Sequence, residues 1–181
     1  MIVTIHQPNF IPWKPFFDKI DEADIFVCLS HCQFEKNGYQ NRFNRNNKWH
    51  TMSVKKGMVP IKDKEYNDPE RDWNKLTKTF PELVEFDTYI GKNLLSTNVA
   101  IIKHIMNKMN IDTVFEMDWL THLKGTHRLV DICVQLGADQ YLAGAGGKDY
   151  LDESLFEEEG IEVIYQKYTN KDHIMEHLWN S

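Results

Sequence analysis

Two short and almost wholly apolar runs, at residues 2–5 and 25–29, most constrain how this chain can fold. Each is too short to form a buried helix, and their β-branched and aromatic residues predict two buried strands. The segment between them, residues 14–22, predicts a helix. Parallel strands joined by a helix form a βαβ unit with a right-handed crossover, so their carboxyl ends lie side by side. The opening of the chain therefore predicts an α/β fold.

Later segments repeat this pattern over 181 residues, a length that fits one domain. Further strands are predicted at residues 113–115, 140–143 and 161–165, and further helices from residue 68, at 94–109, at 126–136 and at 150–159. Asn37-Gly38 is typical of a type I′ hairpin turn, and residues 49–55 predict a strand beyond it. We therefore expect a single α/β domain over residues 1–168, with a mostly parallel sheet, flanking helices, a β-hairpin insertion near residues 33–56 and a C-terminal tail over residues 169–181.

Composition argues against several other classes of protein. No run of 18 apolar residues and no secretory signal is visible, so we expect no membrane insertion. Cys28, Cys32 and Cys133 are odd in number and form no CxxC pair, which is typical of reduced cysteines in a cytoplasmic protein. A net charge of −6 argues against bulk nucleic-acid binding. His173 and His177 are four residues apart but lack a nearby third ligand, so no metal site is expected.

Polar residues follow the first predicted strand at once, in the order His6, Gln7, Pro8 and Asn9. Pro8 restricts Gln7 to extended geometry, and later prolines delay the helix, so this loop is stiff. Ligands of open α/β sheets bind at the carboxyl ends of strands. The loop is either a candidate catalytic segment or a capped turn whose histidine is a core residue.

Basic residues are concentrated between Lys36 and Lys62, where seven Lys and Arg occur without any Asp or Glu, while the rest of the chain carries −13. The same region is dense in amides, and amide and guanidinium groups bind phosphates and sugar hydroxyls. A solvated hairpin face explains the charge equally well. The candidate substrate-binding residues here are Gln33, Lys36, Asn41, Arg42, Asn44 and Lys55.

A glycine-rich loop follows the predicted strand at residues 140–143. Its candidate substrate-binding residues are Gly144, Gly146, Gly147, Lys148 and Asp149. Glycines allow backbone N–H groups to approach a ligand closely or to adopt positive φ, and Asp149 is placed to cap the next helix. The spacing matches neither a P-loop nor GxGxxG, so a tight strand-to-helix turn is the alternative.

Three blocks of the sequence resemble the WbqC-like family of bacteria: IHQPNFIPWKPFFDKIDEADIFV, QFEKNGYQNRF and LGADQYLAGAGGKDYLDESLFEEEGIEVIYQ. The resemblance implies a role in the biosynthesis of surface polysaccharide, typically the O-antigen of lipopolysaccharide. The activity it implies is transfer of an amino acid such as glycine, or of another acyl group, to the amine of a nucleotide-linked sugar. A fainter architectural similarity to pantothenate synthetase, without that family's HxGH loop, leaves ATP as a cofactor to consider.

Acyl transfer to an amine needs a base, donors for the tetrahedral oxyanion and cations for the diphosphate. His6 is the candidate base because its unperturbed pKa of about 6.5 suits neutral pH. The candidates for orienting the substrate or contacting the oxyanion are Gln7, Asn9, Gln33 and Asn41. The candidates for binding the diphosphate are Lys36, Arg42 and Lys55. The glycine loop is a candidate for binding a second phosphate.

No Ser-His-Asp order or reactive cysteine stands out, so direct transfer is favoured over an acyl-enzyme. The expected partners are a nucleotide-linked amino sugar and an acyl or aminoacyl donor, which the sequence leaves open as free, carrier-bound or tRNA-bound. Two alternatives remain: an ATP-dependent amide-forming ligase and a non-catalytic nucleotide-sugar binding module.

Overall fold

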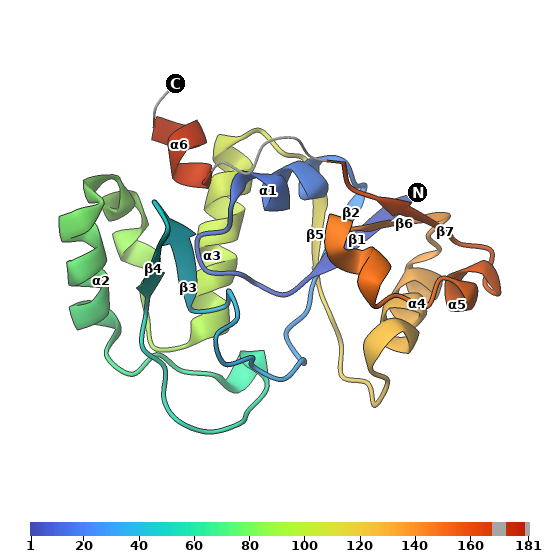
Figure 1. Cartoon of the computed structure of the whole chain (residues 1–181), viewed down its shortest axis with the longest axis horizontal. Coiled ribbons are helices and arrows are strands. Elements are labelled where there is room, and N and C mark those ends of the chain that lie inside the picture. The colour runs from blue at the N-terminus through green and yellow to red at the C-terminus, as the bar shows by residue number, and fades with distance from the viewer. Residues whose placement is uncertain (168–172, 180–181) are drawn as a thin grey trace.

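A five-stranded, all-parallel sheet in the order β5-β2-β1-β6-β7 forms the centre of the molecule (Figure 1). The computed structural model describes residues 1–167 and 173–179. The strands are β1 (Ile2–His6), β2 (Ile25–Cys28), β5 (Val114–Met117), β6 (Gln140–Ala143) and β7 (Glu162–Tyr165). The predicted single α/β domain with a mostly parallel sheet is confirmed.

The chain extends this sheet outward from β1 in two directions. It first adds β2 and then β5 on one side, and later adds β6 and β7 on the other. The strand order therefore reverses between β1 and β6, where Thr4 pairs with Leu142. Ligands of open α/β sheets bind at the carboxyl ends of the strands beside such a reversal. The loops that leave β1 and β6 are thus where the fold favours a site.

Helices cover both faces of the sheet (Figure 1). They are α1 (Lys14–Asp21), α2 (Pro69–Thr79), α3 (Leu94–Lys108), α4 (Gly125–Leu136), α5 (Ser154–Glu157) and α6 (Ile174–Trp179), with 3₁₀ turns at Ile61–Asp63, Pro81–Tyr89 and Ala145–Asp149. Successive strand residues point to opposite faces, so the sheet serves two cores. Phe26 packs in the core that also includes residues of α1 and α3, whereas Val3 and Val27 pack in the core that includes residues of α4 and α5.

The predicted β-hairpin is present as β3 (Arg42–Arg45) and β4 (Lys48–Thr51), but its predicted turn is wrong. The strands turn at Asn46-Asn47, where φ is +54° and +59°, as a type I′ turn requires. Asn37-Gly38 forms a separate turn before the hairpin, in which the Gly38 amide donates to Glu35 O at 3.1 Å. Tertiary packing explains the choice, because this register buries Phe43 in the core.

The predicted helix over residues 150–159 is shorter than expected and begins later. A 3₁₀ turn occupies Ala145–Asp149, and α5 starts only at Ser154. Glu153 is the N-cap residue of α5, with no side-chain capping bond, so the capping role predicted for Asp149 is wrong. None of the three glycines of this loop has positive φ. A positive φ angle is therefore not the reason why glycines occupy these three positions.

The expected C-terminal tail is described only in part. Residues 169–172, 180 and 181 lie outside the described residues, while α6 inserts Ile174 and Met175 into the same core as α1 and α3. In the described part of the chain, no helix is long and apolar enough to cross a membrane.

Candidate functional site

The loop that leaves β1 carries backbone strain at Ile11, five residues after His6. Ile11 is fully buried and has φ +46°, a conformation that β-branched residues rarely adopt. Such residues cost of the order of 1–3 kcal/mol and cluster at ligand sites, where the surrounding structure holds them. The loop is fixed from outside, because the Phe10 amide donates to Tyr39 O at 2.8 Å and Asn98 Nδ2 donates to Pro8 O at 2.8 Å. No pattern in the sequence predicts this strain.

A large cavity of about 740 Å³ opens between this loop, the hairpin and α6. Its size is within the range of about 300–1,000 Å³ that ligand pockets occupy. The wall is rich in neutral amides and holds two carboxylates, an arginine and two histidines. These polar lining residues are His6, Gln7, Asn9, Glu35, Gln40, Asn44, Arg45, Asn46, Asn47, His173 and Glu176.

Three buried groups of residues in this wall lack a hydrogen-bond partner in the described structure: Gln40 Oε1, Arg45 Nε and His173 Nε2. Gln40 uses its amide nitrogen to donate to Gln7 Oε1, which leaves its oxygen as an acceptor. His173 accepts at Nδ1 from the Met175 amide at 3.3 Å, and burial lowers its pKa to about 4, so the neutral ring presents Nε2–H as a donor. Unpaired buried groups are rare, and a ligand with hydroxyl or amide groups can satisfy such donors and acceptors.

His6 is neutral in this structure. Burial is the main cause that lowers its pKa to about 3, and the nearby Lys19 adds to it. Its Nδ1 lies 2.9 Å from the carbonyl oxygen of Gln7, which can only accept, so Nδ1 carries the proton. The ring packs edge-on against Phe16 with centroids 5.1 Å apart. Nε2 is therefore the nitrogen with the free lone pair.

A second cavity of about 230 Å³ lies at the carboxyl ends of β1 and β6. His6 and Trp13 line both this small cavity and the large one. The glycine loop supplies the opposite wall through Gly144, Ala145, Gly146 and Gly147. The structure thus brings together the two strand-end loops that the sequence singled out, as parallel topology predicts.

Lys19 is the unexpected residue of the small cavity. It lies on the inward face of α1, is only 3% exposed and donates from Nζ to Ile5 O at 3.3 Å. No carboxylate of a described residue lines this cavity, and burial lowers the Lys19 pKa to about 7. Helical spacing could have indicated from the sequence that Lys19 faces inward, because Lys19 follows Phe16 by three residues and precedes Ile20 on the same apolar face.

Most candidates from the basic span lie elsewhere. Asn44 lines the large cavity, but Gln33, Lys36, Asn41, Arg42 and Lys55 line neither cavity. Asn41 is buried and donates to Met52 O at 2.7 Å. Arg42 donates to the carbonyl oxygens of Asn37 and Gly38 and lies 4.0 Å above the Trp49 ring.

The other candidates are exposed or paired. Gln33 is exposed and donates to Val59 O at 2.9 Å, and Lys55 pairs with Glu65. In the glycine loop, Lys148 lies 5.0 Å above the Tyr165 ring, outside the small cavity, and Asp149 is also exposed.

The cation that does line the large cavity is Arg45, which the sequence placed in the basic span without a role. Its guanidinium donates to Glu82 Oε1 at 2.8 Å and lies 3.9 Å from Glu176 Oε1. With Glu35 also in the wall, the described charges of this cavity favour a neutral or cationic group over a diphosphate.

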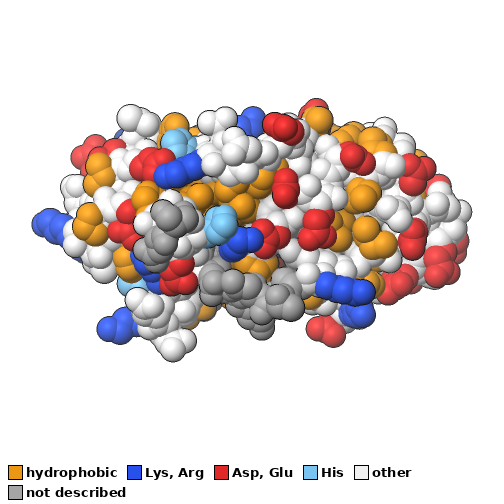
Figure 2. All heavy atoms as spheres, turned by 90° about the horizontal axis from the view of Figure 1, so that it is seen from above, with side chains coloured by type: hydrophobic (Ala, Val, Ile, Leu, Met, Phe, Trp, Pro, Cys, Tyr) orange, Lys and Arg blue, Asp and Glu red, His pale blue; other side chains and the backbone are white. Residues whose placement is uncertain are grey.

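The acidic excess of the chain lies mainly away from this cavity. Figure 2 shows many acidic side chains gathered at the end of the molecule that holds α4 and α5. Glu157, Glu158, Glu159 and Glu162 are exposed there.

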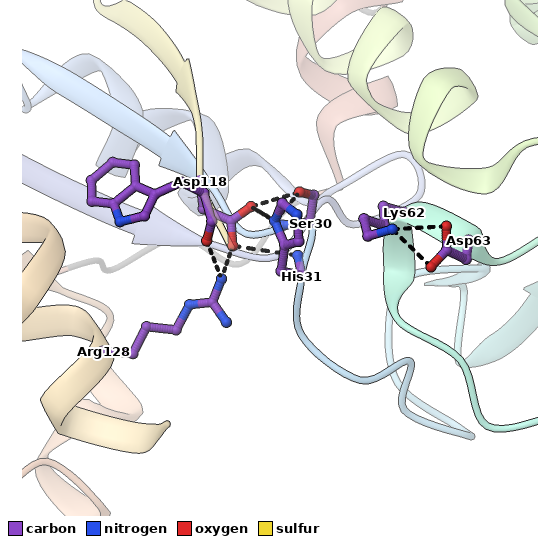
Figure 3. Close-up of polar contacts among 7 residues, drawn as sticks. Ser30, His31, Lys62, Asp63, Asp118 and Arg128 are labelled. Carbon is purple, nitrogen blue, oxygen red and sulfur yellow. Dashed lines mark hydrogen bonds and ion pairs between the residues drawn. The ribbon is translucent and has the colours of Figure 1, made fainter. Parts of the chain in front are cut away.

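A polar network joins the carboxyl ends of β2 and β5 (Figure 3). The fully buried carboxylate of Asp118 accepts from Ser30 N at 2.7 Å, from Ser30 Oγ at 2.6 Å and from the Arg128 guanidinium. His31 Nδ1 lies 3.1 Å from the same carboxylate. Ser30 Oγ also lies 3.1 Å from His31 Nδ1, which is the same ring nitrogen that faces Asp118. A catalytic triad uses the two different nitrogens of its histidine, one toward the serine and one toward the carboxylate, so this serine is not arranged as a triad nucleophile. The network is a structural clamp between the strand ends.

No group of three or more metal-ligating side chains occurs among the residues that the structure describes.

Comparison with known proteins gives one family and one relative. The WbqC-like protein family matches the chain over residues 7–175. The uncharacterized protein Rv1507c of Mycobacterium tuberculosis is 28% identical over 189 residues, which cover 92% of this chain and 82% of that protein. No solved structure matches the chain significantly.

Proposed function

Because the chain belongs to the WbqC-like protein family, we propose that it transfers an acyl or aminoacyl group to the amine of a nucleotide-linked amino sugar. The role implied by this class is in O-antigen and other surface-polysaccharide biosynthesis. One observation carries the proposal: His6 lies where a large and a small cavity meet. A group transfer between two substrates needs such an arrangement, with the reacting atoms at the junction.

The large cavity suits the amino sugar. Its amides and the unpaired groups of Gln40 and His173 offer acceptors and donors for hydroxyl and acetamido groups. The carboxylates of Glu35 and Glu176 can accept hydrogen bonds from the neutral amine of the sugar in the same cavity. The small cavity, at about 230 Å³, has room for a small acyl group.

The chemistry forms a C–N bond between the sugar amine and the acyl carbonyl carbon. The carbonyl oxygen takes the π electron pair, and the departing group later leaves with the electron pair of its own bond to carbon. The amine must lose a proton. Neutral His6 accepts that hydrogen at Nε2 and passes it to the departing group, since a ring with a pKa of about 3 does not store it. Gln7 and Asn9, which line the large cavity, are placed to orient the sugar.

The test begins with binding. Nucleotide-linked amino sugars are screened for a rise in melting temperature of the wild-type chain, with and without ATP. Asn44→Ala, in the large cavity, should weaken the shift, while the exposed Asn74→Ala should leave it unchanged. Equal shifts in both variants contradict a sugar site in this cavity. Saturable binding with no acyl transfer from any donor supports a non-catalytic binding module instead, and pyrophosphate release with ATP and a free acid supports a ligase.

A further inference from the structure

The ammonium of Lys19 has hydrogen-bonding capacity that the protein does not use. An ammonium carries three donors, and the described structure gives Lys19 one acceptor, Ile5 O at 3.3 Å. None of the described ion pairs involves Lys19, although its side chain is almost completely buried. Buried charges are normally paired, so an anion from outside is the missing partner.

The surroundings of Lys19 determine what kind of anion fits. The titratable groups facing it in the small cavity are His6 from β1, Tyr141 from β6 and Tyr150 after the glycine loop, and none of these is acidic. Burial raises the pKa of both tyrosines, so they stay neutral, and His6 is neutral as well. The cavity therefore offers a single positive charge.

The remaining wall combines apolar residues with polar groups: Ile5, Trp13, Pro15 and Phe16 lie beside Gln166 and the glycine loop at residues 144–147. A phosphate dianion or a diphosphate carries two or more negative charges, which exceed the single positive charge that this cavity offers. A carboxylate carries one charge, and its small organic body fits apolar walls and a volume of about 230 Å³.

We propose that the small cavity binds a small free carboxylate, held by the Lys19 ammonium at the junction with His6. The inference rests on the proposed function, which it deepens by naming the acyl source as a small free acid. Its carboxylate must first be activated by a nucleoside triphosphate such as ATP: a carboxylate oxygen forms a bond to phosphorus, pyrophosphate or nucleoside diphosphate leaves, and the resulting nucleotidyl or phosphoryl group is the departing group when the amine attacks. Anion binding requires Lys19 in its charged state, and burial lowers the pKa of the empty site to about 7. Binding is then coupled to proton uptake above that pH.

The experiment is calorimetric titration of the full chain with acetate at pH 6 and at pH 8. Acetate should bind with one site per chain, about tenfold more weakly at pH 8 than at pH 6, because a growing fraction of Lys19 is neutral. Lys19→Met, which keeps the length of the side chain, should weaken binding at pH 6 at least tenfold. Lys14→Met, on the same helix but paired with Asp18, should bind like wild type.

Several results overturn the proposal: no acetate binding at pH 6, the same affinity in Lys19→Met as in wild type, or tighter binding of inorganic phosphate than of acetate at pH 6. If Lys19→Met does not fold, equal wild-type affinity at pH 6 and pH 8 overturns it. The proposed function can fail independently of this carboxylate site, because acetate binding does not require acyl transfer. Acylation by a Lys19→Met protein with an unchanged KM for the donor contradicts the carboxylate site alone.

Discussion

Lys19 donates a hydrogen bond to the carbonyl oxygen of Ile5, 3.3 Å away, and so connects helix α1 to the strand position directly before His6. This contact places the buried ammonium at the carboxyl end of β1, beside the point where the strand order reverses. The strained loop, the glycine loop and the two cavities all meet in that region. Its groups can be tested one at a time.

Stability should depend on pH through Lys19. Burial lowers its pKa in the folded state from 10.5 to about 7, so between these values the unfolded chain binds more protons than the folded one. The free energy of unfolding therefore rises with pH in this window, by up to about 1.4 kcal/mol per pH unit. Urea unfolding at pH 7, 8 and 9 measures the slope. Lys19→Met should reduce it, whereas Lys14→Met should keep it; equal slopes in all three proteins contradict a buried, unpaired Lys19.

The clamp around Asp118 should be a large contributor to stability. Asp118→Asn removes the charge opposite the buried Arg128 guanidinium and should cost about 3–5 kcal/mol, because an unpaired buried charge remains. Asp112→Asn, at an exposed position six residues earlier, should change stability by less than about 0.5 kcal/mol. Denaturant unfolding compares the two. A small loss in Asp118→Asn indicates that Arg128 finds water or another partner.

Adjacent glycines of the loop after β6 should respond differently to valine. A Cβ atom at Gly147 meets Ala143 Cβ at 3.1 Å and Leu151 Cδ1 at 3.0 Å, so Gly147→Val should destabilise the fold by about 1–3 kcal/mol. A Cβ atom at Gly146 meets nothing within 4 Å, and this residue lines the small cavity. Gly146→Val should therefore fold normally and weaken acetate binding. Thermal melts and the acetate titration separate the two effects, and normal binding by Gly146→Val indicates a plain turn.

The sequence predicted much of the sheet and one part of the site for a common reason. Apolar runs and helical spacing are local signals, and the carboxyl ends of parallel strands share one edge, so the loops beginning at His6 and Gly144 could be placed together. The contacts of Arg42 and Asn41 could not be predicted in this way. Their partners are carbonyl oxygens, which every residue carries and no sequence pattern distinguishes.

Other site features depend on long-range packing. The hairpin turn lies at Asn46-Asn47 because Phe43 enters the core, which turn propensity alone does not determine. His173 reaches the large cavity only because α6 packs back against the core. Lys19 was visible as a charge on an apolar helix face, but its lack of an acidic partner emerges only from the folded structure.

Acyl transfer at His6 is tested most directly by the mass of a nucleotide-linked amino sugar after incubation with the protein and a panel of free, carrier-bound and tRNA-bound acyl donors. Wild type should add the mass of one acyl unit to the amine. His6→Gln keeps a polar side chain but cannot relay the proton, so its rate should fall about 10²- to 10⁴-fold with binding retained. The exposed His127→Gln should react like wild type. An undiminished rate in His6→Gln, or no mass increase with any donor in wild type, contradicts acyl transfer at this site.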